Sequence, residues 1–202
     1  KKSRMYIAHN TVDNLVDMNI NSLRDSFIFV GTLYKAKGLE ELIVSYSKAL
    51  VDKGSALPKL IIIGGGELYE PLTKYVTDHG LTESIFLVGP IYDQALLKEY
   101  FDKAIFCVSP KQAGLSVLTS MSYGVPFITC SNAITGGELL NIKNYFNGIV
   151  LNDLTQLTEI IKQADINPEK FLDMGKNAFS YYRNERHPDI MANALIRCVE
   201  EI

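Results

Sequence analysis

Six short runs of apolar residues recur along the chain, and segments with helical periodicity separate them. The runs are rich in Ile, Val and Phe, and most of them lack the alternation of apolar and polar residues that a half-exposed strand shows. Continuous apolar runs of this length are typical of strands buried on both faces, as in a parallel sheet. They predict strands at Phe27–Val30, Leu60–Ile63, Ile85–Val88, Ile105–Val108, Phe127–Cys130 and Gly148–Leu151.

The segments between these runs predict helices. After the first run, apolar residues follow the period of 3.6 that marks one face of a helix, at Leu39, Leu42, Ile43, Tyr46, Ala49 and Leu50. Further helices are predicted over Leu68–His79 with Gly80 as C-cap, from Asp93 as N-cap, and over Leu115–Tyr123. The regular alternation predicts an α/β fold, a doubly wound (Rossmann-like), mostly parallel sheet of about six strands.

Both ends of the chain depart from this alternation. Residues 1–25 are polar and weakly patterned, which predicts a connecting segment rather than part of the core. After the last predicted strand, three helical patterns follow one another without strands between them, at Leu154–Ala164, Glu169–Tyr182 and Asp189–Ile202. We therefore expect a linker over 1–25, a sheet domain over 26–185 and a separate C-terminal helix over 186–202.

The composition is that of an ordinary globular protein. The chain has 202 residues, of which 47% are hydrophobic and 21% charged. The formal net charge of -3 argues against a nucleic-acid binder that neutralises phosphates. No apolar run approaches the roughly 20 residues that span a bilayer. The sequence begins at Lys1 and shows no signal peptide.

Cysteine and histidine are too scattered to predict a disulfide framework or a zinc site. The three cysteines are Cys107, Cys130 and Cys198, and the first two fall in predicted strands. Such an odd, widely spaced set favours reduced thiols in the cytoplasm. The three histidines form no pair at the i, i+4 spacing of helical metal ligands.

Several glycines follow the predicted strands, where ligands bind in folds of this class. Gly114, Leu115 and Ser116 open the fourth predicted helix. Unpaired N–H groups and the helix dipole at such a position suit a phosphate or diphosphate. The alternative is an ordinary strand-to-helix turn.

Two other glycine segments fail the strict nucleotide-binding patterns. Gly64–Gly66 is not a G-x-G-x-x-G fingerprint, because the last position is Tyr69. Gly31–Gly38 is not a Walker A loop, because Ala36 stands where the second glycine belongs. Lys37 nevertheless lies near the carboxyl edge of the predicted sheet and can balance phosphate charge. The alternative is a solvated surface lysine.

The order of these pieces resembles the carboxyl-terminal, donor-binding domain of GT-B glycosyltransferases of family 4, the retaining group 1 transferases. His9–Asp13 resembles the interdomain P-N-x-V-D segment, and Phe29–Gly38 resembles V-G-R-L-x-x-x-K-G. Ile63–Gly66 and Leu87–Gly89 resemble the I-G-x-G and F-L-G strand ends. The long G-L-x-x-x-E-A-x-x-x-G-x-P … G-G-x-x-E … N-G pattern is similar to three segments here, Gly114–Pro126, Gly136–Glu138 and Asn147–Gly148.

The chain departs from this family at polar positions. Thr32 stands where the family has a phosphate-binding arginine, and Lys111 and Thr119 stand where its E-x7-E acids belong. In the family, the first acid lies near the donor sugar and the second accepts hydrogen bonds from ribose hydroxyls. A lysine only donates, and a threonine offers a single hydroxyl, so these contacts change. Our hypothesis is that Lys111 partly replaces the lost arginine charge at the diphosphate.

The resemblance implies the donor-binding half of a retaining glycosyltransferase (a hexosyltransferase type). It implies transfer of a sugar from a nucleotide-diphospho-sugar to a hydroxyl acceptor, glycan or lipid-linked, with no metal or other cofactor. The implied diphosphate site is Lys37, Gly31, Thr32, Gly114, Leu115 and Ser116. The donor sugar and ribose region is Lys111, Ala113 and Thr119, and the base region is Pro90 and Ile91. No catalytic residue is assigned.

The resemblance also implies a wider context. Residues 26–185 become the nucleotide-sugar-binding domain, and the helix over 186–202 crosses to an N-terminal acceptor domain that the sequence lacks. We expect the fragment to be inactive alone. The implied pathway is polysaccharide or lipopolysaccharide synthesis in the cytoplasm, with peripheral membrane association of the full-length protein. Two alternatives stay open: a non-catalytic, degenerate GT-B binding domain, and a nucleotide-sugar epimerase of the same architecture.

Overall fold

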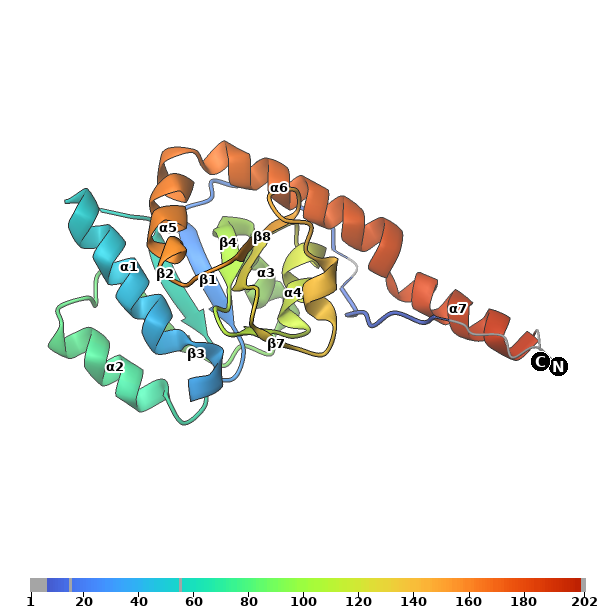
Figure 1. The fold of residues 1–202 in the computed structure, drawn as a ribbon, viewed down its shortest axis with the longest axis horizontal. Coiled ribbons are helices and arrows are strands. Elements are labelled where there is room, and N and C mark those ends of the chain that lie inside the picture. The colour runs from blue at the N-terminus through green and yellow to red at the C-terminus, as the bar shows by residue number, and fades with distance from the viewer. Residues whose placement is uncertain (1–6, 15, 55, 201–202) are drawn as a thin grey trace.

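Six parallel strands form the central sheet of the chain, in the order β3-β2-β1-β4-β6-β8 (Figure 1). The computed structural model describes residues 7–14, 16–54 and 56–200. The strands are β1 (Ser26–Val30), β2 (Lys59–Ile63), β3 (Ile85–Gly89), β4 (Ala104–Val108), β6 (Phe127–Cys130) and β8 (Gly148–Leu151). All six predicted strands are confirmed to within one residue at each end.

Two hydrophobic cores, one on each face of the sheet, explain why the strands are apolar throughout. Phe27 and Phe29 of β1 belong to one core, and Ile28 between them belongs to the other. Because both faces are covered, the side chains of β1 from Ser26 to Phe29 are all buried. The helices that connect the strands are α1 (Leu39–Lys53), α2 (Tyr69–Asp78), α3 (Gln94–Lys103) and α4 (Ser116–Ser122). Helices α1 and α2 cover the first core, and α3 and α4 cover the second.

The direction in which the chain adds strands reverses between β1 and β4. The chain runs from β1 outward to β2 and β3, and then returns through α3 to β4 on the other side of β1. In open α/β sheets, ligands bind at the carboxyl ends of the strands on either side of such a reversal. This topology predicts a ligand site at the loops that follow Val30 and Val108.

A second, two-stranded sheet lies beyond the end of β4 and was not predicted from the sequence. It pairs β5 (Gln112–Ala113) with β7 (Ile134–Thr135) in parallel. The pairing places the segment before Gly114 beside the segment that leads to the short helix η2 (Glu138–Asn141). Helix α4 is one residue shorter at each end than predicted. Asp93 caps α3 as predicted, because its side chain accepts a hydrogen bond from the Leu96 N–H at 2.9 Å.

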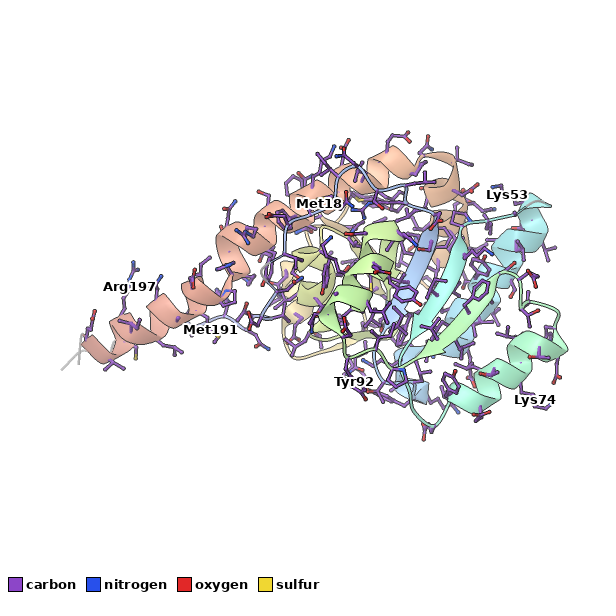
Figure 2. The ribbon with its side chains drawn as sticks, turned by 180° about the vertical axis from the view of Figure 1, so that it is seen from behind. Met18, Lys53, Lys74, Tyr92, Met191 and Arg197 are labelled. Atoms are coloured by element: carbon purple, nitrogen blue, oxygen red, sulfur yellow. The ribbon has the colours of Figure 1, made fainter. Side chains whose placement is uncertain are left out.

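The three C-terminal helices are confirmed. They are α5 (Gln156–Ile166), α6 (Pro168–Tyr181) and α7 (Pro188–Glu200), with a π-helical turn η3 (Tyr182–Arg186) between the last two. Helix α6 packs against α4, β4 and β8, whereas α7 extends away from the sheet (Figure 1). None of the α7 residues is buried, and Figure 2 shows Met191 and Arg197 on this projecting arm. Residues 201–202 of the predicted helix lie outside the described residues.

The described part of the predicted linker contains no helix or strand, but it is tied to the domain. The buried Tyr182 hydroxyl donates to the Val12 carbonyl at 2.6 Å, and the Asn14 side-chain amide donates to the Ser122 hydroxyl at 2.7 Å. Met18 of the same segment packs over Gly124 (Figure 2). Residues 1–6 and 15 of the predicted linker lie outside the described residues. Across the described helices, none combines the length and the hydropathy that a bilayer crossing requires.

The cysteines should react with a thiol reagent in an order set by burial. Cys107 is buried in β4, and burial raises the pKa of its thiol to about 12, whereas Cys198 on α7 is half-exposed. The thiolate is the reactive form, so Cys107 should react only as the chain unfolds. The rate of labelling with a chromogenic disulfide reagent at pH 8, measured in native buffer and in urea, tests this order. The chain with Cys198→Ser is the control and should lose the fast phase; fast native labelling of Cys107 would contradict the burial of β4.

Candidate functional site

A lysine ammonium lies over the end of β1, at the reversal of the sheet. The chain leaves β1 at Gly31, forms the short helix η1 (Lys35–Lys37) and enters α1 after Gly38. A Cβ atom built on Gly31 would lie 3.7 Å from the Lys37 Nζ, so the ammonium lies directly above this glycine. The sequence predicts both residues as part of one anion site, and the structure brings them together.

Lys37 is a half-buried cation whose charge has no anionic partner within the described residues. Burial lowers the pKa of its ammonium, and the nearby Cys107 thiol opposes this shift. Its Nζ lies 5.5 Å from the centre of the Tyr34 ring, and none of the ion pairs found in the described part of the chain includes it. A partly desolvated cation of this kind binds an anion more strongly than a fully hydrated one.

The glycines after β2 hold the backbone under this lysine. Gly64 has φ +148°, and a Cβ built on it would lie only 1.8 Å from the Gly31 carbonyl oxygen. The Gly31 N–H donates to the Ile63 carbonyl at 3.0 Å, and the Leu33 N–H donates to the Gly65 carbonyl at 2.9 Å. The loops after β1 and β2 therefore pack backbone against backbone, which only glycine at position 64 permits.

The start of α4 presents backbone N–H groups on the other side of the reversal. The first hydrogen bonds of this turn are donated by the Val117 N–H to Gly114 and by the Thr119 N–H to Leu115, both at 2.9 Å. The N–H groups of a helix that come before its first such bonds have no acceptor within the helix. Space is open around Gly114, where a built Cβ would meet no atom within 4 Å. The predicted segment Gly114–Ser116 is thus accessible to a ligand.

Lys111 joins this part of the chain to the loop of Lys37. Its backbone N–H donates to the Lys37 carbonyl at 3.2 Å, and its ammonium pairs with the Glu41 carboxylate in the first turns of α1. Burial tends to raise the pKa of Glu41, but the hydrogen bond from Lys111 and the charges of Lys111 and Lys35 lower it overall. The positive charge of Lys111 is therefore already balanced by a residue that the sequence did not indicate.

The remaining predicted residues lie at or near the same edge. Thr32 is exposed after β1, and Ala113 is buried in β5. The Thr119 hydroxyl donates its hydrogen bond to the Leu115 carbonyl at 3.1 Å. Toward a ligand, this oxygen can therefore act only as an acceptor. Neither position of the E-x7-E motif carries a carboxylate. Among the described residues, no three His, Cys, Asp or Glu side chains come close enough together to hold a metal ion.

The predicted base region lies at the outer strand of the same half-sheet. Pro90 and Ile91 directly follow β3, and a Cβ built on Gly65 would lie 3.7 Å from the Pro90 Cδ. The strands β3, β2, β1 and β4 are neighbours in that order, so the edge from Pro90 to Lys111 spans about 14 Å, or three inter-strand spacings. An extended nucleoside diphosphate can bridge such an edge.

A cavity of about 660 Å³ opens beside Lys111, on the β6 and β8 side of this edge. It is lined by polar and apolar groups alike: Lys35, Ala36, Lys111, Cys130, Asn132, Ile134, Asn152, Asp153 and Leu154. Among the residues predicted for the site, only Lys111 contributes to it. The cavity therefore lies next to the predicted diphosphate residues rather than containing them.

Two side-chain pairs that connect these loops are not predicted by the sequence. Glu41 lies 70 residues from Lys111, and the Tyr34 hydroxyl donates to the Gln112 side chain across 78 residues. Nothing in the local sequence marks such pairs. Tyr34 and Gln112 lie in segments that follow predicted strands, and Glu41 lies at the start of the predicted helix after the first of them; this placement predicts proximity but not pairing.

Sequence comparison identifies one family. The family model described as "Glycosyl transferases group 1" matches residues 15–181. A comparison with curated proteins finds no match.

Solved structures share the fold at low identity. A variant of S. aureus TarM, in complex with fondaparinux, alpha-GlcNAc-glycerol and UDP, has a TM-score of 0.75 at 16% identity over 95% of this chain and 37% of its own. HepE from Anabaena, in complex with UDP-glucose, has a TM-score of 0.68 at 17% identity over 88% of this chain and 49% of its own. The chain thus spans less than half the length of these two proteins.

The third similar structure is a single domain. It is the C-terminal domain of LpcC, a glycosyl transferase group 1 family protein from Francisella tularensis, with a TM-score of 0.67 at 17% identity. It matches 83% of this chain and 89% of its own length. The fold of the present chain is that of a GT-B C-terminal domain, and the doubly wound fold predicted from the sequence is confirmed.

Proposed function

The chain belongs to the glycosyl transferases of group 1, and we propose that it binds the nucleotide-diphospho-sugar donor of a retaining enzyme of this family. The observation that carries the proposal is the half-buried Lys37 ammonium over Gly31, which has no ion-pair partner in the described part of the chain. The UDP in the TarM complex and the UDP-glucose in the HepE complex support a donor of this class.

In this proposal the site acts mainly through electrostatics. When the bond between the sugar and the diphosphate breaks, negative charge grows on the leaving phosphate oxygens. Lys37 and the N–H groups of Gly114, Leu115 and Ser116 would stabilise that charge, because they are held in place before the reaction begins. Gly31 and Thr32 would contact the diphosphate through the loop after β1.

The other donor groups are assigned by their place along the same edge. The sugar and ribose would lie near Lys111, Ala113 and Thr119, and the base would lie near Pro90 and Ile91. The sugar would pass to a hydroxyl of a glycan or lipid-linked acceptor with retention of configuration. No residue of this chain is assigned as the catalytic nucleophile or base.

A complete enzyme would need a second domain to hold the acceptor. We propose that 26–185 form the donor domain, that 1–25 are the interdomain linker and that the helix over 186–202 crosses to the acceptor domain. Four apolar side chains of α7 are exposed and would pack on that domain: Ile190, Leu195, Ile196 and Val199. The proposed pathway is polysaccharide or lipopolysaccharide synthesis, with the full-length protein peripheral to the cytoplasmic membrane.

A second candidate function is a non-catalytic domain that binds a nucleotide or a partner. The observation that favours it is the loss of both acids, because Lys111 is paired with Glu41 and Thr119 offers only a hydroxyl. An epimerase would keep the donor site but would need no acceptor, so product analysis with the donor alone separates it from a transferase.

A ligand-observed NMR titration tests the proposed function. The chain is mixed with UDP, GDP, ADP and CMP in turn, and saturation transfer to each nucleotide is measured. We expect one diphosphate to bind in preference to the others, and its nucleoside without phosphates to bind far more weakly. No binding of any nucleotide at millimolar concentration would contradict a donor-binding role and would favour a domain that binds a partner.

A further inference from the structure

The backbone of Lys111 connects three loops at the carboxyl edge of the sheet. Its N–H donates to the Lys37 carbonyl at 3.2 Å, and its carbonyl accepts a hydrogen bond from the Ile134 N–H at 2.8 Å. The loop after β1 and the loop after β6 are thereby fixed to the segment that leads to Gly114. Through these backbone bonds of Lys111, the placements of the loop of Lys37, the loop after β6 and the segment before Gly114 depend on one another.

The side chain of Lys111 runs along the start of α1. A Cβ built on Gly38, the residue after Lys37, would lie 2.9 Å from the Lys111 Cγ and 3.2 Å from its Cδ. The aliphatic part of the side chain therefore covers Gly38, and the ammonium ends at the Glu41 carboxylate. The two side chains are 42% and 38% exposed, so the pair lies at the surface but is not fully solvated.

We propose that Lys111 and Glu41 form a positioning pair that holds the loop of Lys37 against the loop of Gly114. In this role the charge of Lys111 is directed to Glu41 and not to the donor phosphates. The proposal rests on the proposed function, and it replaces the sequence-based hypothesis in which Lys111 takes over the charge of the missing arginine.

The two roles of Lys111 predict opposite effects of exchanging the charges. If Lys111 and Glu41 only need to attract each other, the exchanged pair still holds the two loops together. If Lys111 contacts phosphate, a carboxylate at position 111 repels the nucleotide, whatever stands at position 41. Lys35 also faces Glu41, and Asp153 and Cys130 lie near Lys111, so each single change is compared with the double change in the same surroundings.

The experiment measures the affinity for UDP of the wild-type chain, Lys111→Glu, Glu41→Lys and the double variant by titration calorimetry. We expect each single variant to bind UDP roughly 3- to 10-fold more weakly, because like charges then face each other between the loops. The double variant should recover to within about 2-fold of wild type, a coupling that additive effects cannot produce. A double variant that binds as weakly as Lys111→Glu would overturn the proposal.

A surface pair elsewhere provides the matched control. Lys74 and Asp78 pair at 2.6 Å on α2, with side chains 76% and 52% exposed, and Figure 2 shows Lys74 on this outer helix. Lys74→Glu should leave the UDP affinity unchanged. A loss as large as that of Lys111→Glu would show a general charge effect and would also overturn the proposal.

The melting temperatures of the same four chains separate this proposal from the proposed function. If the wild-type chain binds no UDP or other nucleotide, the proposed function fails, and the pair is then judged by stability alone. Both single variants should melt at a lower temperature, and the double variant should recover. Single variants that melt like wild type would show that the pair does not form. If the single variants lose stability but keep full UDP affinity, the pair stabilises the fold without positioning the site, and the proposal is overturned.

Discussion

Replacement of Lys37 by alanine should weaken the binding of a nucleoside diphosphate by about 10- to 100-fold. Hydrogen bonds to a charged partner contribute about 1.5–3 kcal/mol, and each 1.4 kcal/mol corresponds to a factor of ten in affinity. The Lys37 ammonium is half-buried over Gly31, so little of this energy should be lost to competing water. Titration calorimetry of the wild-type and variant chains with the preferred diphosphate measures the effect.

Lys35 offers the matched control within the same short helix. It is exposed and lies two residues earlier, so Lys35→Ala removes the same charge without emptying the site. Its affinity should stay within about 3-fold of wild type, since exposed charges are screened by solvent. Equal losses in the two variants would contradict the site.

The pH dependence of binding follows from the direction of the Lys37 shift. Because burial lowers the pKa of this ammonium below 10.5, the wild-type chain should lose diphosphate affinity at a lower pH than an ordinary lysine would allow. A bound diphosphate favours the charged form and moves the pKa upward again. Lys37→Ala should show a flatter profile over the same range.

Replacement of Gly64 by alanine should destabilise the fold by about 2–6 kcal/mol, the sum of a steric term and a backbone-strain term. The new Cβ would lie 1.8 Å from the Gly31 carbonyl oxygen, and the backbone at φ +148° is a conformation that alanine rarely adopts. Overpacking against backbone and backbone strain each cost about 1–3 kcal/mol. Urea unfolding followed by circular dichroism measures the loss.

Gly54 separates the steric clash from the backbone strain. It has φ +64° at the end of α1, and a Cβ built on it would meet no atom within 4 Å. Gly54→Ala should therefore cost only about 1–2 kcal/mol. If Gly64→Ala costs no more than this control, the close packing of the loops after β1 and β2 is not present in solution.

The sheet could be predicted from the sequence because burial on both faces leaves a plain signal. Phe127–Cys130 and Gly148–Leu151 are apolar runs without a polar face, and the structure has these two strands with the same bounds. Strands β5 and β7 have two residues each, which is too short for any periodicity. They form because the loops after β4 and β6 meet, a contact between distant segments.

The site was predictable only in part for the same reason. Lys37, Gly31 and Gly114 lie in the segments that follow β1 and β4, so the topology brings them to one edge of the sheet. The role of Lys111 depends on Glu41, and their pairing arises only when the segment after β4 lies beside the start of α1. From the sequence, the charge of Lys111 is expected at the diphosphate, whereas the structure shows it paired with Glu41.

A map of the nucleotide on the chain itself tests a donor site between β1 and β4 without any substitution. A ¹⁵N-labelled chain is titrated with UDP or the preferred diphosphate, and the amide shifts are followed. We expect the largest changes at the amides of Gly31, Gly114, Leu115 and Ser116, and smaller changes at the amide of Ile91. If the shifts change only around Asn132 and Asn152 in the neighbouring cavity, and the amides of Gly31 and Gly114–Ser116 do not move, the result contradicts a donor site between β1 and β4.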